Sequence, residues 1–143
     1  MSLSQAEIAQ LIPHTGTMCL LESVRQWDAD GIVCTAVSHR DPANPLRRDG
    51  VLPAVCGVEY AAQAMGVHGR LATNNRTKPA AGYLASLREV VLHVERLDEG
   101  GDQLTVEVRR LADSGESVMC EFTIRSAERT LLSGRATLLL EAA

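Results

Sequence analysis

The segment LPAVCGVEYAAQAMG at residues 52–66 constrains the fold of this chain more than any other part of the sequence. Its side chains are small and apolar, with three polar exceptions, Glu59, Tyr60 and Gln63. A helix that is apolar nearly all round has to be buried. Because burying a carboxylate is costly unless it is paired or protonated, Glu59 is expected to have a structural or chemical role.

The chain of 143 residues is long enough to form a single domain over 1–143 with a self-sufficient core. Its net charge of −4, its four aromatic residues (one Trp, two Tyr and one Phe) and its lack of a basic run argue against a nucleic-acid partner. No apolar run approaches the roughly 20 residues that span a membrane, and no signal-peptide pattern is present, which favours a cytoplasmic protein. The four isolated cysteines, with no CxxC motif, predict reduced core residues, no metal site and no cofactor.

Turn residues divide the rest of the chain into one short helix and six strands. The capping box from Ser4 to Glu7 predicts a helix that runs to about Ile12. Alternating apolar and polar residues predict strands at 20–28, 31–37, 82–96, 103–111, 117–125 and 129–140. One apolar helix among antiparallel strands predicts an α+β fold in which a curved sheet wraps around the helix. Because the helix lacks a polar face, a dimer is also expected, paired through the strand near 82–91.

Three motifs follow one another along nearly the whole chain. They are LIPH at 11–14 with MCLLE at 18–22, LP at 52–53 with Glu59 and QA at 63–64, and GDQL at 101–104. Together they resemble motifs of the β-hydroxyacyl-[acyl carrier protein] dehydratases of fatty-acid synthesis. The resemblance implies a hot-dog fold, in which an antiparallel curved sheet encloses one long buried helix. It also implies a thioester-linked acyl chain as substrate, carried by an acyl carrier protein or by coenzyme A.

The sequence departs from that family at the catalytic histidine. The family pairs the helix glutamate with a histidine in an HFPG loop fourteen positions earlier, and that position is Pro45 in this chain. The remaining pattern is similar to divergent dehydratase-like proteins encoded with aryl-polyene pathways. This resemblance implies a homodimer, or a heterodimer in which the divergent subunit accompanies a related dehydratase.

Glu59 matches the family's catalytic carboxylate, and we expect it to act as a general acid or to be held by backbone N–H groups and an arginine from a partner subunit. Gln63, one helical turn later, is expected to orient Glu59 or the adjacent loop, or to be a core amide. Asp49 is an alternative base, and we assign it to substrate binding together with His39 and Gly57.

Four histidines are candidates for the missing base. His14 ranks first because it lies in the retained LPH motif, and His39 ranks second because it opens the loop that should hold the family's histidine. His68 and His93 are expected on another helix face and in a strand, where a structural or solvated role is more common.

The first functional hypothesis is therefore a dehydratase-like protein in which Glu59 protonates the leaving β-hydroxyl. The alternatives are a hot-dog thioesterase that uses Glu59 without a histidine, and a non-catalytic subunit of a heterodimeric dehydratase.

Overall fold

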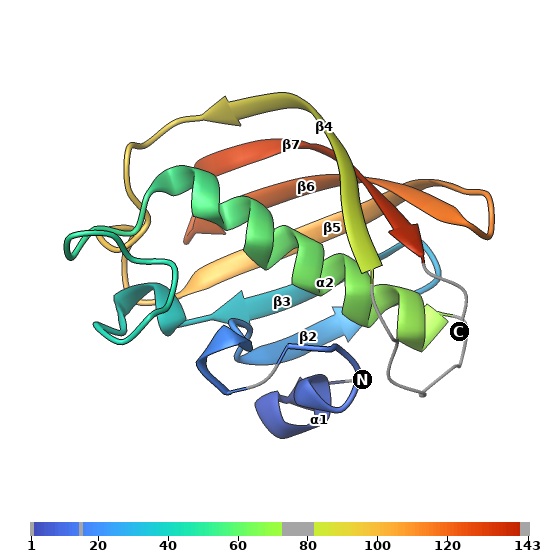
Figure 1. Cartoon of the computed structure of the whole chain (residues 1–143), viewed down its shortest axis with the longest axis horizontal. Coiled ribbons are helices and arrows are strands. Elements are labelled where there is room, and N and C mark those ends of the chain that lie inside the picture. The colour runs from blue at the N-terminus through green and yellow to red at the C-terminus, as the bar shows by residue number, and fades with distance from the viewer. Residues whose placement is uncertain (1, 15, 73–81, 141–143) are drawn as a thin grey trace.

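The computed structural model describes residues 2–14, 16–72 and 82–140 (Figure 1). The helical elements are α1 (Gln5–Ala9), η1 (Gly16–Met18), η2 (Ser38–Arg40), η3 (Ala54–Cys56) and α2 (Gly57–Ala72). The strands are β1 (Leu3–Ser4), β2 (Ser23–Trp27), β3 (Gly31–Ala36), β4 (Gly82–Leu92), β5 (Leu104–Asp113), β6 (Ser117–Ser126) and β7 (Arg129–Leu140).

All seven strands belong to one sheet of order β1-β2-β3-β5-β6-β7-β4, and every neighbouring pair is antiparallel. The sheet curves around α2, with β4 at one edge and β2 toward the other (Figure 1). Alternate residues of β5 and β6, among them Val106, Val108, Phe122 and Ile124, point toward α2 and are buried. The predicted α+β architecture, a curved antiparallel sheet with one long helix, is confirmed.

The predicted element boundaries need three corrections. The capping box of Ser4 and Glu7 is present, but α1 ends at Ala9 instead of Ile12. β2 begins at Ser23 rather than at residue 20. β4 ends at Leu92 and not at residue 96. Shortly after this end, Glu95 O accepts a 3.0 Å hydrogen bond from the N–H of Ala54.

Gly57 lets the start of α2 approach the sheet closely. A Cβ atom at this position would lie 2.7 Å from Leu132 Cδ2 and 3.0 Å from Ile124 Cδ1. Its N–H is used inside the helix, where the carbonyls of Ala54 and Val55 accept it. Gly57 therefore has a packing role at the contact between helix and sheet, and its assignment to substrate binding stays a prediction.

The sheet does not enclose α2 completely. A helix that is apolar nearly all round predicts that Val55, Val58, Ala62 and Met65 are buried. Val58 and Met65 are buried, whereas Ala62 is half-buried and Val55 is 52% exposed. Val55, Ala62 and Glu59 follow one another at helical spacing, so they form one stripe that faces away from the sheet. The strands of this chain therefore cover one side of the helix, and a second subunit remains the expected cover for the other side.

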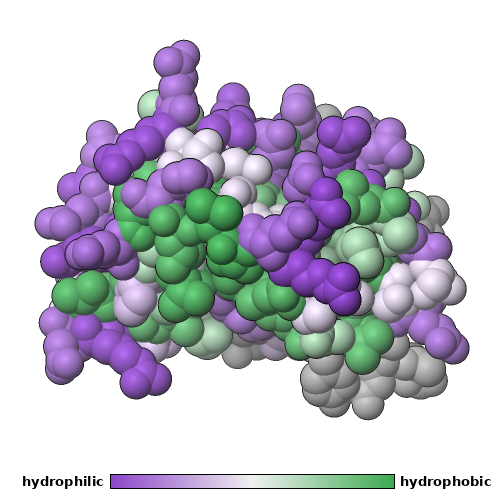
Figure 2. Space-filling view, turned by 90° about the horizontal axis from the view of Figure 1, so that it is seen from above, coloured by the Kyte–Doolittle hydropathy of each residue, from purple (hydrophilic) through white to green (hydrophobic). Residues whose placement is uncertain are grey.

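A second open apolar surface lies along β4. Leu84, Leu87, Val91 and Leu92 are each between 40% and 47% exposed, although β4 pairs with β7 along its other edge. Figure 2 looks onto this side of the molecule and shows apolar residues gathered there. The exposed edge of β4 therefore has the composition of a strand that pairs with another chain.

Candidate active site

Glu59 lies in the first turn of α2, on the stripe that the sheet leaves open. Its side chain is 35% exposed, so the expected deep burial of this carboxylate is wrong. Among the described residues its ion-pair partner is His14, and no arginine pairs with it.

His14 is brought to Glu59 from the N-terminal segment that follows α1. Its Nε2 atom lies 3.0 Å from Glu59 Oε1, and its side chain is 29% exposed. Its other ring nitrogen, Nδ1, is buried and has no hydrogen-bond partner within the described ranges. Of the four histidines, His14 is the one that contacts Glu59, and the contact places an imidazole and a carboxylate at hydrogen-bond distance.

Gln63 holds the segment that carries His14. Its Oε1 accepts the N–H of Leu20 at 2.9 Å, and its Nε2 donates to the carbonyl of Met18 at 2.6 Å. The Gln63 side chain is buried, and both of its polar ends are therefore satisfied by one short stretch of backbone. These contacts fit the expectation of a core amide bonded to backbone, and the orienting role of Gln63 stays a prediction.

His39, the second candidate base, does not reach Glu59. It is fully buried in η2, where its Nε2 bonds the carbonyl of Gly101 at 2.7 Å. Because a carbonyl only accepts, the proton of neutral His39 is on Nε2. The expected roles of His39 as a base and in substrate binding are thus corrected to a structural role. Sequence spacing could not reveal this contact, which joins residues 62 positions apart.

His68 is a second buried structural histidine, and its Nε2 bonds the carbonyl of Asp28 at 2.7 Å. His93 is exposed at the end of β4. The pKa of His68, like that of His39, lies below its usual value, because burial disfavours the charged imidazolium.

The buried histidines predict a loss of stability in mild acid. Since the pKa values of His39 and His68 are lowered on folding, the unfolded chain binds more protons below about pH 6.5, and stability falls as the pH decreases through that value. Urea unfolding between pH 8 and pH 5 measures the slope of the free energy of unfolding against pH. We expect His39→Gln to reduce the slope and His93→Gln, at an exposed site, to leave it unchanged. Equal slopes in all three proteins would contradict the prediction.

Asp98 and Arg47 fix the chain that leads into α2, and the sequence analysis did not single out Asp98. The Asp98 side chain is only 6% exposed, accepts the N–H of Leu52 at 3.0 Å and pairs with the guanidinium of Arg96. Hydrogen bonds from Arg96 are the main cause that lowers the pKa of Asp98 to about 2. Arg47 Nη1 lies 3.8 Å from Asp98. A charged run in the sequence does not tell which charges will be buried together.

Asp49 lies away from the contacts that surround Glu59. It is exposed in the turn between Arg48 and Val51, whose backbones bond each other at 2.8 and 2.9 Å. Asp49 has a φ of 52° and Gly50 a φ of 77°, values typical of a type I′ turn. Nothing in these contacts supports Asp49 as the base or as a substrate ligand.

An open hollow lies beside the start of α2. It has a volume of about 430 Å³ and is lined by residues 53–55 and 92–95. Val55 in its wall lies one helical turn before Glu59 and on the same stripe. Neither His14 nor Glu59 is among the residues that line the hollow.

A curved antiparallel sheet around one helix, with a carboxylate near the helix start, defines a hot-dog protein of the dehydratase and thioesterase class. The profile of the ApeP-like family, described as ApeP dehydratase, matches residues 6–141. The chain therefore belongs to the ApeP-like family. This confirms the predicted class of function, a β-hydroxyacyl-[acyl carrier protein] dehydratase-like protein of the polyene-pathway branch.

Solved structures share the fold. The dehydratase heterocomplex ApeI:P from Xenorhabdus doucetiae matches with a TM-score of 0.84 and 26% identity, over 94% of this chain and 91% of that chain. Zebrafish thioesterase superfamily member 2 matches with a TM-score of 0.65 and 13% identity, over 96% and 95% of the two chains. AziG of S. sahachiroi matches with a TM-score of 0.53 and 16% identity, over 86% and 92%. No curated protein matches the sequence at a significant level.

None of the four cysteines forms a disulfide, and three of them, Cys19, Cys34 and Cys120, are buried, as expected for reduced core residues. Burial raises the pKa of Cys34 to about 12 and that of Cys120 to about 11. Within residues 2–14, 16–72 and 82–140, no group of three or more His, Cys, Asp or Glu side chains is placed to hold a metal ion. None of the helices in this part of the chain is long and apolar enough to cross a membrane.

Proposed function

We propose that this protein dehydrates a β-hydroxyacyl thioester, with His14 as the base and Glu59 as the acid. The observation that carries the proposal is the 3.0 Å contact between His14 Nε2 and Glu59 Oε1. In this assignment a histidine from the N-terminal segment replaces the one that the family has at the position of Pro45. Both members of the pair come from a single chain. The pair is about one third exposed, so a substrate can reach it.

The proposed reaction is a balanced elimination of water. His14 Nε2 removes the α-proton of the acyl chain, and the electron pair forms the Cα=Cβ double bond as the bond from Cβ to the hydroxyl oxygen breaks. The carboxyl proton of Glu59 leaves with the hydroxyl as water. Transfer of the proton from His14 Nε2 to Glu59 Oε1 then restores both groups. The unpartnered Nδ1 is buried, which leaves Nε2 as the nitrogen that exchanges protons.

The proposal includes an acyl carrier protein as the carrier of the substrate, a cytoplasmic location, and a heterodimer with a related dehydratase. The likeness to a dehydratase heterocomplex at 26% identity supports the heterodimer. Two open surfaces support it independently: the free edge of β4, with Leu87 at its centre, and the stripe that runs from Val55 in η3 along α2. A partner strand on β4 would cover both the edge and part of the stripe.

A charge on the edge of β4 is expected to weaken association. Leu87→Asp places a carboxylate in the middle of this edge, and we expect at least a tenfold loss of affinity, because an unpaired charge would be desolvated in the interface. Leu111→Asp is the matched control, since Leu111 on β5 is 42% exposed and Leu87 is 41% exposed. Light scattering on the protein alone, and on the protein co-expressed with a related dehydratase, measures the effect. Equal association of the two variants would exclude β4 as the interface.

One assay distinguishes the proposed function from its alternatives. The purified protein is incubated, alone and with a related dehydratase, with β-hydroxyacyl, enoyl and saturated acyl thioesters. Dehydration or hydration that requires His14 and Glu59 supports the proposal. Hydrolysis of the thioester would support the alternative in which Glu59 activates water. Activity that depends only on the partner would indicate a non-catalytic subunit and overturn the proposal.

A further inference from the structure

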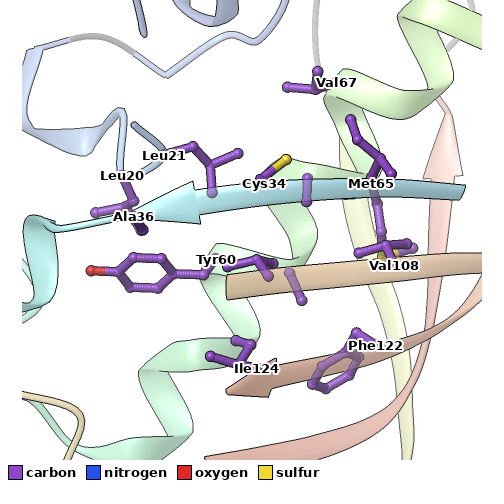
Figure 3. Packing of buried hydrophobic residues seen from close by; sticks show 14 of the residues in the cluster. Leu20, Leu21, Cys34, Ala36, Tyr60, Met65, Val67, Val108, Phe122 and Ile124 are labelled. Atoms are coloured by element: carbon purple, nitrogen blue, oxygen red, sulfur yellow. The ribbon is translucent and has the colours of Figure 1, made fainter. Parts of the chain in front are cut away.

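Tyr60, the residue after Glu59, is buried in the core and carries a hydroxyl that the proposed reaction does not use. Its side chain is 0% exposed, and burial raises the pKa of the phenol. Figure 3 shows the ring among core residues, with the hydroxyl at the outer side of the labelled group. A buried tyrosine hydroxyl needs hydrogen-bond partners, so its contacts show what it connects.

The Tyr60 hydroxyl connects two loops. It lies 2.8 Å from Ser38 Oγ and accepts from Asn44 Nδ2 at 3.1 Å. Ser38 Oγ in turn donates to the carbonyl of Leu20 at 2.8 Å. Because Ser38 uses its proton on Leu20, Tyr60 is the donor to Ser38, and the chain runs in one direction from Asn44 through Tyr60 and Ser38 to Leu20.

The same peptide segment is held from a second point on α2. The N–H of Leu20 donates to Gln63 Oε1 at 2.9 Å, while its carbonyl accepts from Ser38. Two side chains of α2, one residue and four residues after Glu59, thus fix the stretch that follows His14. His14 and Glu59 are themselves partly exposed, so their 3.0 Å contact depends on how firmly these backbones are held.

We propose that Tyr60 is a positioning residue for the His14–Glu59 pair, which it aligns through Ser38 and Leu20. The inference rests on the proposed roles of His14 and Glu59 in the reaction. It extends them by assigning a function to the loop at 38–44, which retains no histidine near Glu59. Asn44 stabilises this loop from the other side, since its Nδ2 also donates to the carbonyl of Ser38 at 2.9 Å.

The test removes one hydroxyl at a time. Tyr60→Phe and Ser38→Ala each break the chain, and we expect kcat to fall roughly five- to fiftyfold while KM changes less than threefold. The double variant should be no slower than the slower single variant, because both substitutions break one path. Thr35→Val is the control: it removes a buried hydroxyl that bonds Glu22 and Ser23 near the same segment, outside the chain that includes Tyr60.

A second readout is independent of turnover. The imidazole signals of 15N-labelled His14 are compared with and without Glu59→Gln, in the wild-type and Tyr60→Phe backgrounds. Glu59→Gln is expected to change the chemical shifts of the His14 imidazole. We expect this change to be at least twofold smaller in the Tyr60→Phe background than in the wild-type background, and to be unaltered in a Thr35→Val background. If Tyr60→Phe gives the same shift change as Thr35→Val, the positioning role is wrong. If the signals respond as expected but no thioester reacts, the proposed function fails while the positioning role stands.

Discussion

Replacing Glu59 with glutamine is expected to lower the dehydration rate by about two to four orders of magnitude. Glutamine keeps the shape of the side chain and can still bond His14, but it cannot donate the proton that leaves with the hydroxyl. Stability should change by less than about 1 kcal/mol, because the Glu59 side chain is 35% exposed and pairs with a partly exposed histidine. Turnover of the β-hydroxyacyl thioester and the melting temperature, measured on the same preparation, test both statements.

Two histidine variants complete this experiment. His14→Gln should reduce the rate by a similar factor, whereas His93→Gln, at the exposed end of β4, should leave it within twofold. A rate unchanged within threefold in Glu59→Gln would exclude Glu59 as the acid. A large loss in Glu59→Gln with full activity in His14→Gln would instead indicate that the carboxylate works without His14.

Replacing Asp98 with asparagine is expected to destabilise the protein by about 2–4 kcal/mol, since it breaks a buried ion pair while Arg47 and Arg96 remain. The lowered pKa of Asp98, about 2 against an ordinary value of 3.8, agrees in sign with a stabilising ion pair. Because this pKa is lowered on folding, the contribution is present above about pH 4 and is lost as the pH falls toward 2. Urea unfolding at pH 7 and at pH 3 measures it.

Asp102→Asn is the matched control for Asp98→Asn. Asp102 also pairs with an arginine, Arg40, but its side chain is 96% exposed, so we expect a change within about 0.5 kcal/mol. If the two variants lose equal stability, burial of the Asp98 pair is not what makes it important. If Asp98→Asn leaves the free energy of unfolding unchanged, the start of α2 is held by the contacts of the 52–54 backbone alone.

The apolar segment at 52–66 and the alternating strands predicted the class of fold, because periodicity depends on local geometry that each residue carries with it. The same periodicity predicted a helix of small residues packed against the sheet, but it does not show which side of the helix stays exposed to solvent. Val55 illustrates the limit, since it is as apolar as Val58 but lies 52% exposed on the far side from the strands. Whether an apolar residue is buried depends on the position of the sheet, which is a tertiary property.

The sequence by itself determined that Glu59 is the one carboxylate of the segment 54–72, because the identity and order of the residues do not depend on the fold. It also put His14 first among four histidines, on the strength of a retained motif. The tertiary structure alone decided that His14 Nε2 lies 3.0 Å from Glu59 and that His39 lies buried against Gly101. Both contacts join residues more than forty positions apart, and such a distance is set by how the loops fold onto α2 and not by local propensity.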